Sequence, residues 1–426
     1  MLERRTGIFV AVGIALPAIL LALTHGLGHA ADMEFFHRWY LAFGEAFREP
    51  AFGEPATFYR DGPGVNYPIV GALVVCLPAR IVEAFTGAPL DLATYRLVLK
   101  ATLAAGDVAL ILALSRLARL LGAPRPRLLA LAIYLVPASW AAGTFFGQID
   151  GIGSLLLVVA TSELLAYRRQ GSALTLSLAL LATISALLCK QLAWFSLPAL
   201  LAWLGLGLST HRRRAHLALA LASPLLLFAV DPFLALPAGF HSHLCFVISA
   251  GSRHGDLVVA TGASLWSLVA RPGQDAHEAR WLGLSAFAIG WLLFALIQLV
   301  ALRRARAARF SDAALIEWQA TLHFAMGVAL TGVHERYLAH AWPFALVLLF
   351  ARPEPSWARA TLVLGAIWWG LFVIASVAWD AFEGPLSFLR IDSPLAVLLS
   401  ICLLVWLARP IAPLPAPDRT VDRRPS

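Results

Sequence analysis

Apolar runs long enough to cross a membrane recur along most of the chain, with short polar segments between them. A membrane-spanning helix needs about 20 mostly apolar residues. Because so many runs approach this length, the pattern predicts an all-α polytopic membrane protein with about twelve transmembrane helices. The predicted spans are 7–27, 98–118, 128–144, 151–167, 172–189, 192–208, 216–236, 281–302, 312–332, 337–351, 357–378 and 393–408.

A further apolar stretch, 67–85, is interrupted by Pro68, Pro78, Arg80 and Glu83. Arginine clusters mark the cytoplasmic ends of membrane helices, and here all clusters share one side only if this stretch does not cross. We therefore predict an interfacial helix or re-entrant hairpin at 67–85, and two cytoplasmic termini. The clusters are Arg4/Arg5, Arg116/Arg119/Arg125/Arg127, Arg168/Arg169, Arg212/Arg213/Arg214, Arg303/Arg304/Arg306/Arg309, Arg352/Arg359 and Arg409/Arg419/Arg423/Arg424.

Composition supports the membrane assignment. Of 426 residues, 60% are hydrophobic and 14% charged, against roughly 25% charged in soluble domains. We expect one transmembrane domain over 1–409, with outer loops at 28–97 and 237–280. The tail, 410–426, is rich in Pro, Arg and Asp, which predicts a disordered cytoplasmic end. The four cysteines lie in or near apolar segments and show no metal or disulfide spacing.

The net charge of +8 is carried almost entirely by arginine, since Lys100 and Lys190 are the only lysines. On the predicted topology most of this charge orients the helices, so we expect a lipid bilayer and no nucleic acid as its partner. A chain rich in Ala, Leu and Arg and nearly free of Lys is typical of GC-rich bacterial genomes. The predicted location is therefore the bacterial inner (plasma) membrane.

Polar residues collect in compact groups on the predicted outer face, where ionisable side chains are functional candidates. The cytoplasmic loops hold little but arginine, so we expect any chemistry to face outward. The groups are Asp32-Met33-Glu34 with His37-Arg38-Trp39, Gly147-Gln148-Ile149-Asp150, Lys190-Gln191, and His334-Glu335-Arg336-Tyr337.

Asp32 follows the first predicted helix at the membrane surface, and two interpretations compete. A carboxylate there can act as general base toward an acceptor hydroxyl. Alternatively, Asp32 caps an interfacial helix whose Phe35, Trp39 and Phe43 face lipid. In a helix, Asp32, Phe36 and Trp39 share one side, whereas positions i and i+2 such as Asp32 and Glu34 do not.

The other groups have structural alternatives as well. Asp150 is either a functional carboxylate or the cap of the next helix. Lys190 either binds a phosphate or buried carboxylate, or extends its amine to the membrane surface. Arg336 either binds phosphate or pairs with its neighbour Glu335. Asp107 and Asp231, inside predicted spans, are interpreted as structural residues.

Taken in order, these motifs resemble the GT-C superfamily of polytopic glycosyltransferases, above all the dolichyl-phosphate-glucose glucosyltransferases of N-glycan precursor assembly and their bacterial relatives. The resemblance spans residues 32 to 338, and each motif is weak alone. Ile69 stands where the family usually has a second proline, and Asn66 where eukaryotic members have Asp. The matching segments are Asp32-Met33-Glu34 with Arg38-Trp39, Asn66-Tyr67-Pro68, Gly147-Gln148-Ile149-Asp150, Lys190-Gln191 and His334-Glu335-Arg336-Tyr337.

The resemblance implies an inverting transfer of a hexose from a polyprenyl-phosphate donor to a hydroxyl of a glycolipid or glycan acceptor. Asp32 is then the catalytic base, and Lys190 and Arg336 contact the lipid phosphate or the acceptor. No cofactor or metal is expected, although Asp32 and Glu34 together offer oxygen ligands for a divalent cation. The implied substrate-binding residues are Glu34, Arg38, Trp39, Tyr67, Gln148, Asp150, Lys190, Gln191, His334, Glu335, Arg336 and Tyr337.

A transporter or flippase of lipid-linked saccharides is the alternative from another class. It predicts inverted repeats and charges near the middle of the membrane. The sequence has no evident repeat, and its polar groups are predicted to share one surface. This distribution favours the transferase.

Overall fold

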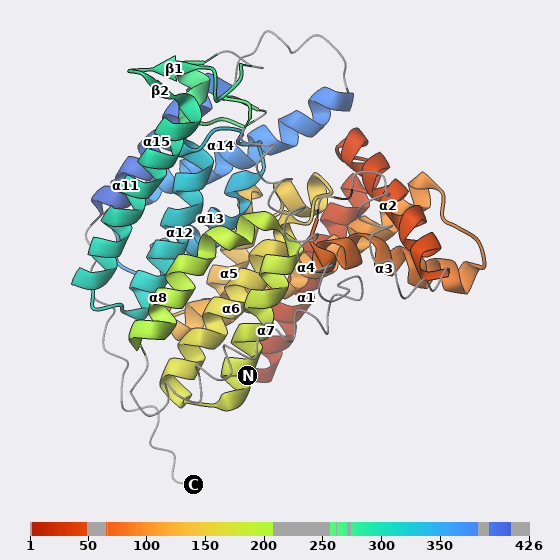
Figure 1. Ribbon diagram of the computed structural model, residues 1–426. Coiled ribbons are helices and arrows are strands. Elements are labelled where there is room, and N and C mark those ends of the chain that lie inside the picture. Colours follow the sequence, from red (N-terminus) through yellow and green to blue (C-terminus); the bar gives the residue numbers. More distant parts are fainter. Residues whose placement is uncertain are drawn as a thin grey trace.

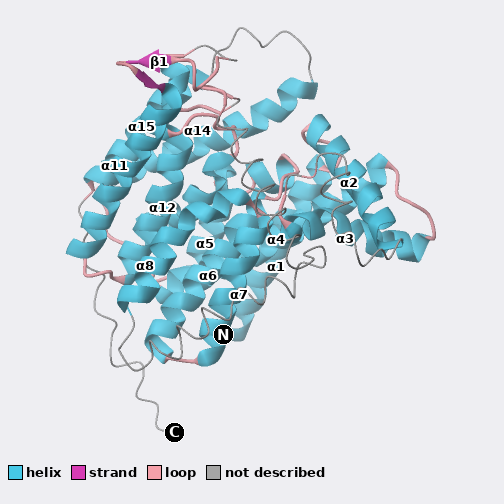
Figure 2. Ribbon diagram, in the orientation of Figure 1, coloured by secondary structure: helices cyan, strands magenta, loops and turns pink. Residues whose placement is uncertain are grey.

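The computed structural model describes residues 2–48, 65, 67–207, 256–260, 262–270, 274–381 and 392–409. They form a helical bundle with one short antiparallel hairpin, β1 (Arg280–Trp281) and β2 (Leu284–Ser285), which confirms the predicted all-α polytopic membrane fold (Figures 1 and 2). The α-helices are α1 (Leu2–Thr24), α2 (Ala30–Arg48), α3 (Ile69–Thr86), α4 (Leu92–Leu120), α5 (Pro126–Leu135), α6 (Asp150–Gln170), α7 (Ala173–Cys189), α8 (Leu197–Gly207), α11 (Ala286–Ala307), α12 (Asp312–Ala329), α13 (Ala341–Ala351), α14 (Ser356–Ala381) and α15 (Asp392–Ala408).

Six helices are long and apolar enough to cross a membrane, judged by length and composition within the described residues. They contain Thr6–Thr24, Ile69–Thr86, Leu92–Leu120, Asp150–Gln170, Ala286–Ala307 and Ser356–Val377. Shorter apolar helices cover Pro126–Leu135, Ala173–Cys189, Gln191–Gly205, Tyr337–Ala351 and Pro394–Ala408.

Several predicted spans are broken rather than continuous. The span predicted at 128–144 ends as α5 at Leu135, before Pro137, and continues as a 3₁₀ turn and a π-helix, Ala141–Phe145. Likewise, 3₁₀ turns precede α8 (Gln191–Ser196) and α13 (Tyr337–His340). Each of these irregular segments adjoins one of the predicted polar groups, as expected where non-helical backbone lines a functional site. The span predicted at 216–236 lies outside the described residues.

From Ile69 onward the stretch 67–85 is one continuous helix, α3, so the hairpin alternative was wrong. Its interior Pro78 leaves the helix unbroken. α3 packs against α2, α4 and α7, and Figure 1 shows α2 and α3 on the opposite side of the bundle from α11. Lys100 near the start of α4 donates to the carbonyl of Thr24 at the end of α1, at 2.6 Å. The chain therefore leaves α1 and enters α4 at the same end of the bundle, and α2 with α3 makes no net crossing.

The described arginine clusters gather at the other end. Arg127 at the start of α5 donates to Thr6 in α1 at 2.7 Å. Arg168 and Arg169 at the end of α6 pair with Asp312 at the start of α12, at 3.1 and 3.0 Å. We call this the arginine end and the opposite one the motif end. Because α12 rises about 27 Å over its 18 residues, the two ends are well separated.

One buried carboxylate inside the bundle, Asp107, is held by hydrogen bonds from neighbouring segments. Asp107 accepts from Tyr134 at 3.0 Å and from Thr144 at 2.6 Å, which agrees with a structural role. Cys76, Cys189 and Cys402 are buried as free thiols. Asp231 and Cys245 lie outside the described residues.

Candidate active site

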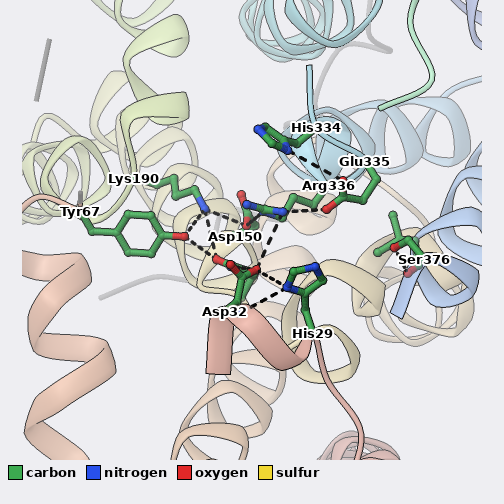
Figure 3. Close-up of polar contacts among 11 residues, drawn as sticks. His29, Asp32, Tyr67, Asp150, Lys190, His334, Glu335, Arg336 and Ser376 are labelled. Atoms are coloured by element: carbon green, nitrogen blue, oxygen red, sulfur yellow. Dashed lines mark hydrogen bonds and ion pairs between the residues drawn. The ribbon is translucent and has the colours of Figure 1, made fainter. Parts of the chain in front are cut away.

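Residues from distant parts of the sequence meet at the motif end in one polar cluster (Figure 3). Asp32 comes from the first turn of α2, Tyr67 from the segment before α3, and Asp150 from the first residue of α6. Lys190 follows α7, and Arg336 lies between α12 and the 3₁₀ turn before α13. The structure thus brings together side chains from each of the predicted outer polar groups.

The centre of the cluster is the ion pair between Lys190 Nζ and Asp150 Oδ2, at 3.0 Å. Both side chains are almost fully buried, with exposures of 5% and 0%. Lys190 also donates to the Tyr67 hydroxyl at 2.9 Å, and that hydroxyl donates to Gln148 Oε1 at 2.5 Å. Asp150 does not cap α6, and Lys190 does not reach out to the surface, so both structural alternatives were wrong.

Burial and neighbouring charges determine the protonation states of Lys190 and Tyr67. Burial acts to lower the pKa of Lys190, but Asp150 and the Tyr67 oxygen outweigh it, and the net pKa is raised above 10.5. Burial raises the pKa of Tyr67 above 10.0, with Lys190 and Arg336 opposing. At neutral pH Lys190 is therefore a cation and Tyr67 a neutral phenol.

Arg336 is the second buried cation of the cluster. Its Nη1 lies 2.7 Å from Glu335 Oε1, so the predicted pairing of these neighbours is present. The same guanidinium also lies 4.0 Å from Asp32 and 3.9 Å from Asp150. Arg336 therefore interacts with carboxylates from two other segments as well as with its neighbour Glu335. Burial tends to lower the pKa of Arg336, but the surrounding carboxylates, Glu335 first, raise it, so the charge is permanent.

Asp32 is the carboxylate that this arrangement leaves without a close cation. Gln148 Nε2 donates to Asp32 Oδ2 at 2.5 Å, and Arg336 approaches the same oxygen at 4.0 Å. His29 Nδ1 lies 3.3 Å from Oδ2, but it also accepts the backbone N–H of Asp32, which places the proton of a neutral ring on Nε2. Within the described structure the hydrogen bond to this carboxylate is made to Oδ2, so Oδ1 can accept a proton. Its side chain is 21% exposed, against 0% for Asp150 and 4% for Glu335.

Two glycines allow the cluster to close. Gly147 has a φ of +91°, and a Cβ there would lie 2.6 Å from Met33, the residue after Asp32. Gly71 in α3 lets that helix approach the carbonyl of Cys189, directly before Lys190; a Cβ at this position would clash with that carbonyl. A larger residue at Gly147 or Gly71 would therefore displace the segments that carry Gln148 and Lys190.

Two supporting residues escaped the sequence analysis. Lys100 is fully buried and donates to the carbonyls of Thr24 and Phe145, at 2.6 and 3.0 Å, tying the end of α1 to the segment that carries Gln148. His29 stacks on Phe146 at a ring separation of 5.0 Å. The signals were present: Lys100 is one of only two lysines in the sequence, and His29 lies three residues before Asp32.

Some predicted substrate-binding residues lie outside the cluster. Glu34 and Arg38 are on the exposed face of α2, and Arg38 covers the Phe35 ring at 4.6 Å. Trp39 and Phe43 are buried among aromatic residues of α2 and aliphatic residues of α3, not facing lipid as the capping alternative required. The physical reason is the helical register of α2, which turns Asp32, Phe36 and Trp39 inward together.

The remaining predicted residues flank the cluster. Trp39 packs edge-on against Tyr67, with ring centroids 5.2 Å apart. Tyr337 packs against the apolar cluster around Met326, and His334 lies 4.0 Å from Glu335. Gln191 begins the 3₁₀ turn after Lys190 and is half-buried.

The cluster can perform acid–base and phosphate chemistry. It offers one partly exposed carboxylate, Asp32, near two permanent cations. The Gln148 amide links Asp32 to Lys190, and Arg336 approaches Asp32 directly. Across the described ranges no three His, Cys, Asp or Glu side chains are placed to share a metal ion.

Comparisons with known proteins found a similarity to this chain among solved structures and none among family models or curated proteins. Among solved structures it is similar to the archaeal oligosaccharyltransferase AglB from Archaeoglobus fulgidus, in complex with an inhibitory peptide and a dolichol-phosphate. The sequences are 14% identical, the TM-score is 0.48, and the match covers 94% of this chain and 54% of the other. The chain therefore spans about half the length of that oligosaccharyltransferase.

Proposed function

We propose that the protein is an inverting glycosyltransferase of the GT-C type. It moves a hexose from a polyprenyl-phosphate-linked donor to an acceptor hydroxyl on the non-cytoplasmic face of the membrane. The observation that carries the proposal is the charge arrangement: among the described residues Asp32 Oδ1 accepts no hydrogen bond, while Lys190 and Arg336 are held as cations nearby. The ordered motifs that resemble this superfamily support it.

In this mechanism Asp32 Oδ1 takes the proton of the acceptor hydroxyl. The acceptor oxygen attacks the anomeric carbon, and the bond from that carbon to the phosphate oxygen breaks. Polyprenyl phosphate leaves with the electron pair, and the configuration inverts. Gln148 holds Oδ2 and so orients the carboxylate, which leaves Oδ1 free to act.

Lys190 and Arg336 are suited to the developing charge on the leaving phosphate. Charges fixed before the reaction stabilise such a transition state without reorganising. Because the buried carboxylates Asp150 and Glu335 hold both cations in place, neither has to be recruited when the donor binds. A lipid-linked donor also explains why the site lies at the end of a bundle of apolar helices.

The test is transfer by the purified full-length protein in liposomes. A panel of radiolabelled polyprenyl-phosphate hexoses is supplied with a mixed glycolipid acceptor fraction, and the product linkage is determined by NMR. We expect transfer from one donor with inversion, abolished in Asp32→Asn and retained in Glu278→Gln, which removes an exposed carboxylate. Retention of configuration, or equal transfer by Asp32→Asn, would contradict the proposal.

A further inference from the structure

A second cluster of charges lies at the arginine end, far from the candidate active site. Arg304 in α11 and Glu317 in α12 form an ion pair at 2.6 Å, and Arg409 after α15 pairs with Glu354 at 3.0 Å. Arg304 also donates to the carbonyls of Leu407 and Arg409, at 2.5 and 2.7 Å. These contacts join α11, α12 and α15 to the segment between α13 and α14.

Two further arginines of this cluster have no carboxylate partner. Arg352 follows α13 and Arg359 lies in the first turns of α14; within the described residues neither forms an ion pair. Arg359 donates only to the carbonyl of Arg352, at 3.4 Å. Four arginines therefore share two glutamates, and the cluster carries an excess of positive charge.

Of the two arginines without a carboxylate partner, Arg352 is buried, with an exposure of 4%. Its Nε and Nη2 are buried and have no hydrogen-bond partner in the described structure. These two nitrogens form one edge of the guanidinium, the edge that binds an oxyanion through two parallel hydrogen bonds. Burial lowers the pKa of Arg352, and Glu354 and Glu317 oppose this shift without cancelling it.

A buried arginine with a free edge is costly unless an anion completes it. The neighbouring face of α14 indicates which anion. Trp357, Leu364, Trp368 and Leu371 are each 43–54% exposed and follow one another at helical spacing away from the arginine end. An aromatic residue beside basic residues at a helix end is typical of the headgroup level of a membrane.

We propose that Arg352 and Arg359 form a binding site for a phosphate oxyanion, supplied by the headgroup of an anionic phospholipid whose acyl chain lies along α14. Both free nitrogens of Arg352 are covered by protein, so binding requires the guanidinium to turn outward. A long side chain at a helix end can make this movement. The site lies at the opposite end of the bundle from Asp32, and its occupation does not depend on the glycosyltransferase proposal.

The experiment measures the melting midpoint of the delipidated full-length protein with phosphatidylglycerol, phosphatidylcholine or sodium phosphate added. We expect phosphatidylglycerol to raise the midpoint of the wild type in a saturable manner, with phosphatidylcholine having little effect. Arg352→Gln is expected to weaken this response by about tenfold or more in lipid concentration. Arg352→Lys keeps the charge but loses the two-nitrogen edge. Its response to phosphatidylglycerol is expected to lie between those of the wild type and Arg352→Gln.

Arg306→Gln is the matched control, because Arg306 is an exposed arginine in the last turn of α11, at the arginine end of the bundle. It should respond to lipid as the wild type does, and native mass spectrometry should show the same difference in bound phosphatidylglycerol. If Arg352→Gln does not fold, Arg359→Gln takes its place. Equal responses in Arg352→Gln and wild type, or an equal loss in Arg306→Gln, would overturn the proposal. An equal shift with sodium phosphate would support the oxyanion site and overturn its lipid source.

Discussion

Buried cations stand at both ends of the bundle, but their surroundings are opposite. At the motif end, carboxylates raise the pKa of Arg336 and Lys190 despite burial. At the arginine end, burial outweighs two glutamates and lowers the pKa of Arg352. The candidate active-site cluster has three carboxylates (Asp32, Asp150 and Glu335) for two cations. The described cluster around Arg352 has two glutamates for four arginines. The candidate active-site cluster therefore has one more carboxylate than cations, and the cluster at the arginine end has more cations than carboxylates.

The difference shows what a buried charge means at each end. A cation already paired by protein keeps its position whether or not a substrate is bound, which suits transition-state stabilisation. An unpaired cation gains most when a ligand arrives, which suits binding. Substitutions at the two ends should therefore act on stability in opposite directions.

The largest expected effect is that of Lys190→Met. Removing one partner of a buried ion pair leaves Asp150 uncompensated, and we expect a loss of about 3–5 kcal/mol in the free energy of unfolding, together with loss of transfer. The double variant Lys190→Met/Asp150→Asn should recover much of the stability and none of the activity. Thermal unfolding and the transfer assay check this. Full stability in the single variant would show that the pair is not buried as the structure describes.

Arg352→Met provides the opposite case. In delipidated protein it removes a buried charge that has no described carboxylate partner, so the free energy of unfolding should be unchanged or about 1 kcal/mol higher. The measurement is the same unfolding experiment, run beside Lys190→Met. A loss as large as that of Lys190→Met would remove the distinction between the two ends.

The pH dependence sharpens the comparison further. Since the pKa of Lys190 is raised in the folded protein, its stabilising contribution is complete below the unfolded value of 10.5 and is lost as the pH rises through the folded value. The stability difference between wild type and Lys190→Met should therefore be constant from pH 7 to about pH 10. A difference that shrinks between pH 7 and pH 9 would mean that Lys190 loses its proton in that interval.

The smallest effect is expected for Glu34→Gln. Glu34 matches the motif of the resembling superfamily, but the structure places it on the exposed face of α2. Exposed substitutions usually change stability by less than about 0.5 kcal/mol, and we expect transfer within a factor of about two of wild type. A large loss of activity would show that Glu34 takes part in the reaction, with an acceptor or a metal ion approaching the exposed face of α2.

Much of this arrangement could be predicted from sequence. Apolar runs located most of the helices. Arginine parity predicted that 67–85 does not cross the membrane, and in the structure α1 ends and α4 begins at the same end of the bundle. The motifs identified Asp32, Asp150, Lys190 and Arg336, because ionisable residues are rare in apolar segments and conspicuous there.

What could not be predicted depends on contacts between distant segments. The lysine at position 100 sits in a long apolar run, and the carbonyls it binds belong to α1 and to the segment before Gln148. Arg352 has no ion pair in the described structure because the nearby carboxylate, Glu354, pairs with Arg409. The sequence does not show which arginine Glu354 contacts. The breaks at 136–149, 190–196 and 330–340 fall inside or beside apolar runs whose composition continues to favour helix.

The central claim is that Asp32 acts as base while the cations serve the leaving phosphate. The direct test measures donor affinity and single-turnover transfer on the same preparation of Asp32→Asn. We predict transfer slowed by about 10²–10⁴-fold, with donor affinity within a few-fold of wild type, because Asp32 serves the acceptor and not the phosphate. Transfer at the wild-type rate, or a loss explained entirely by weaker donor binding, would contradict the account.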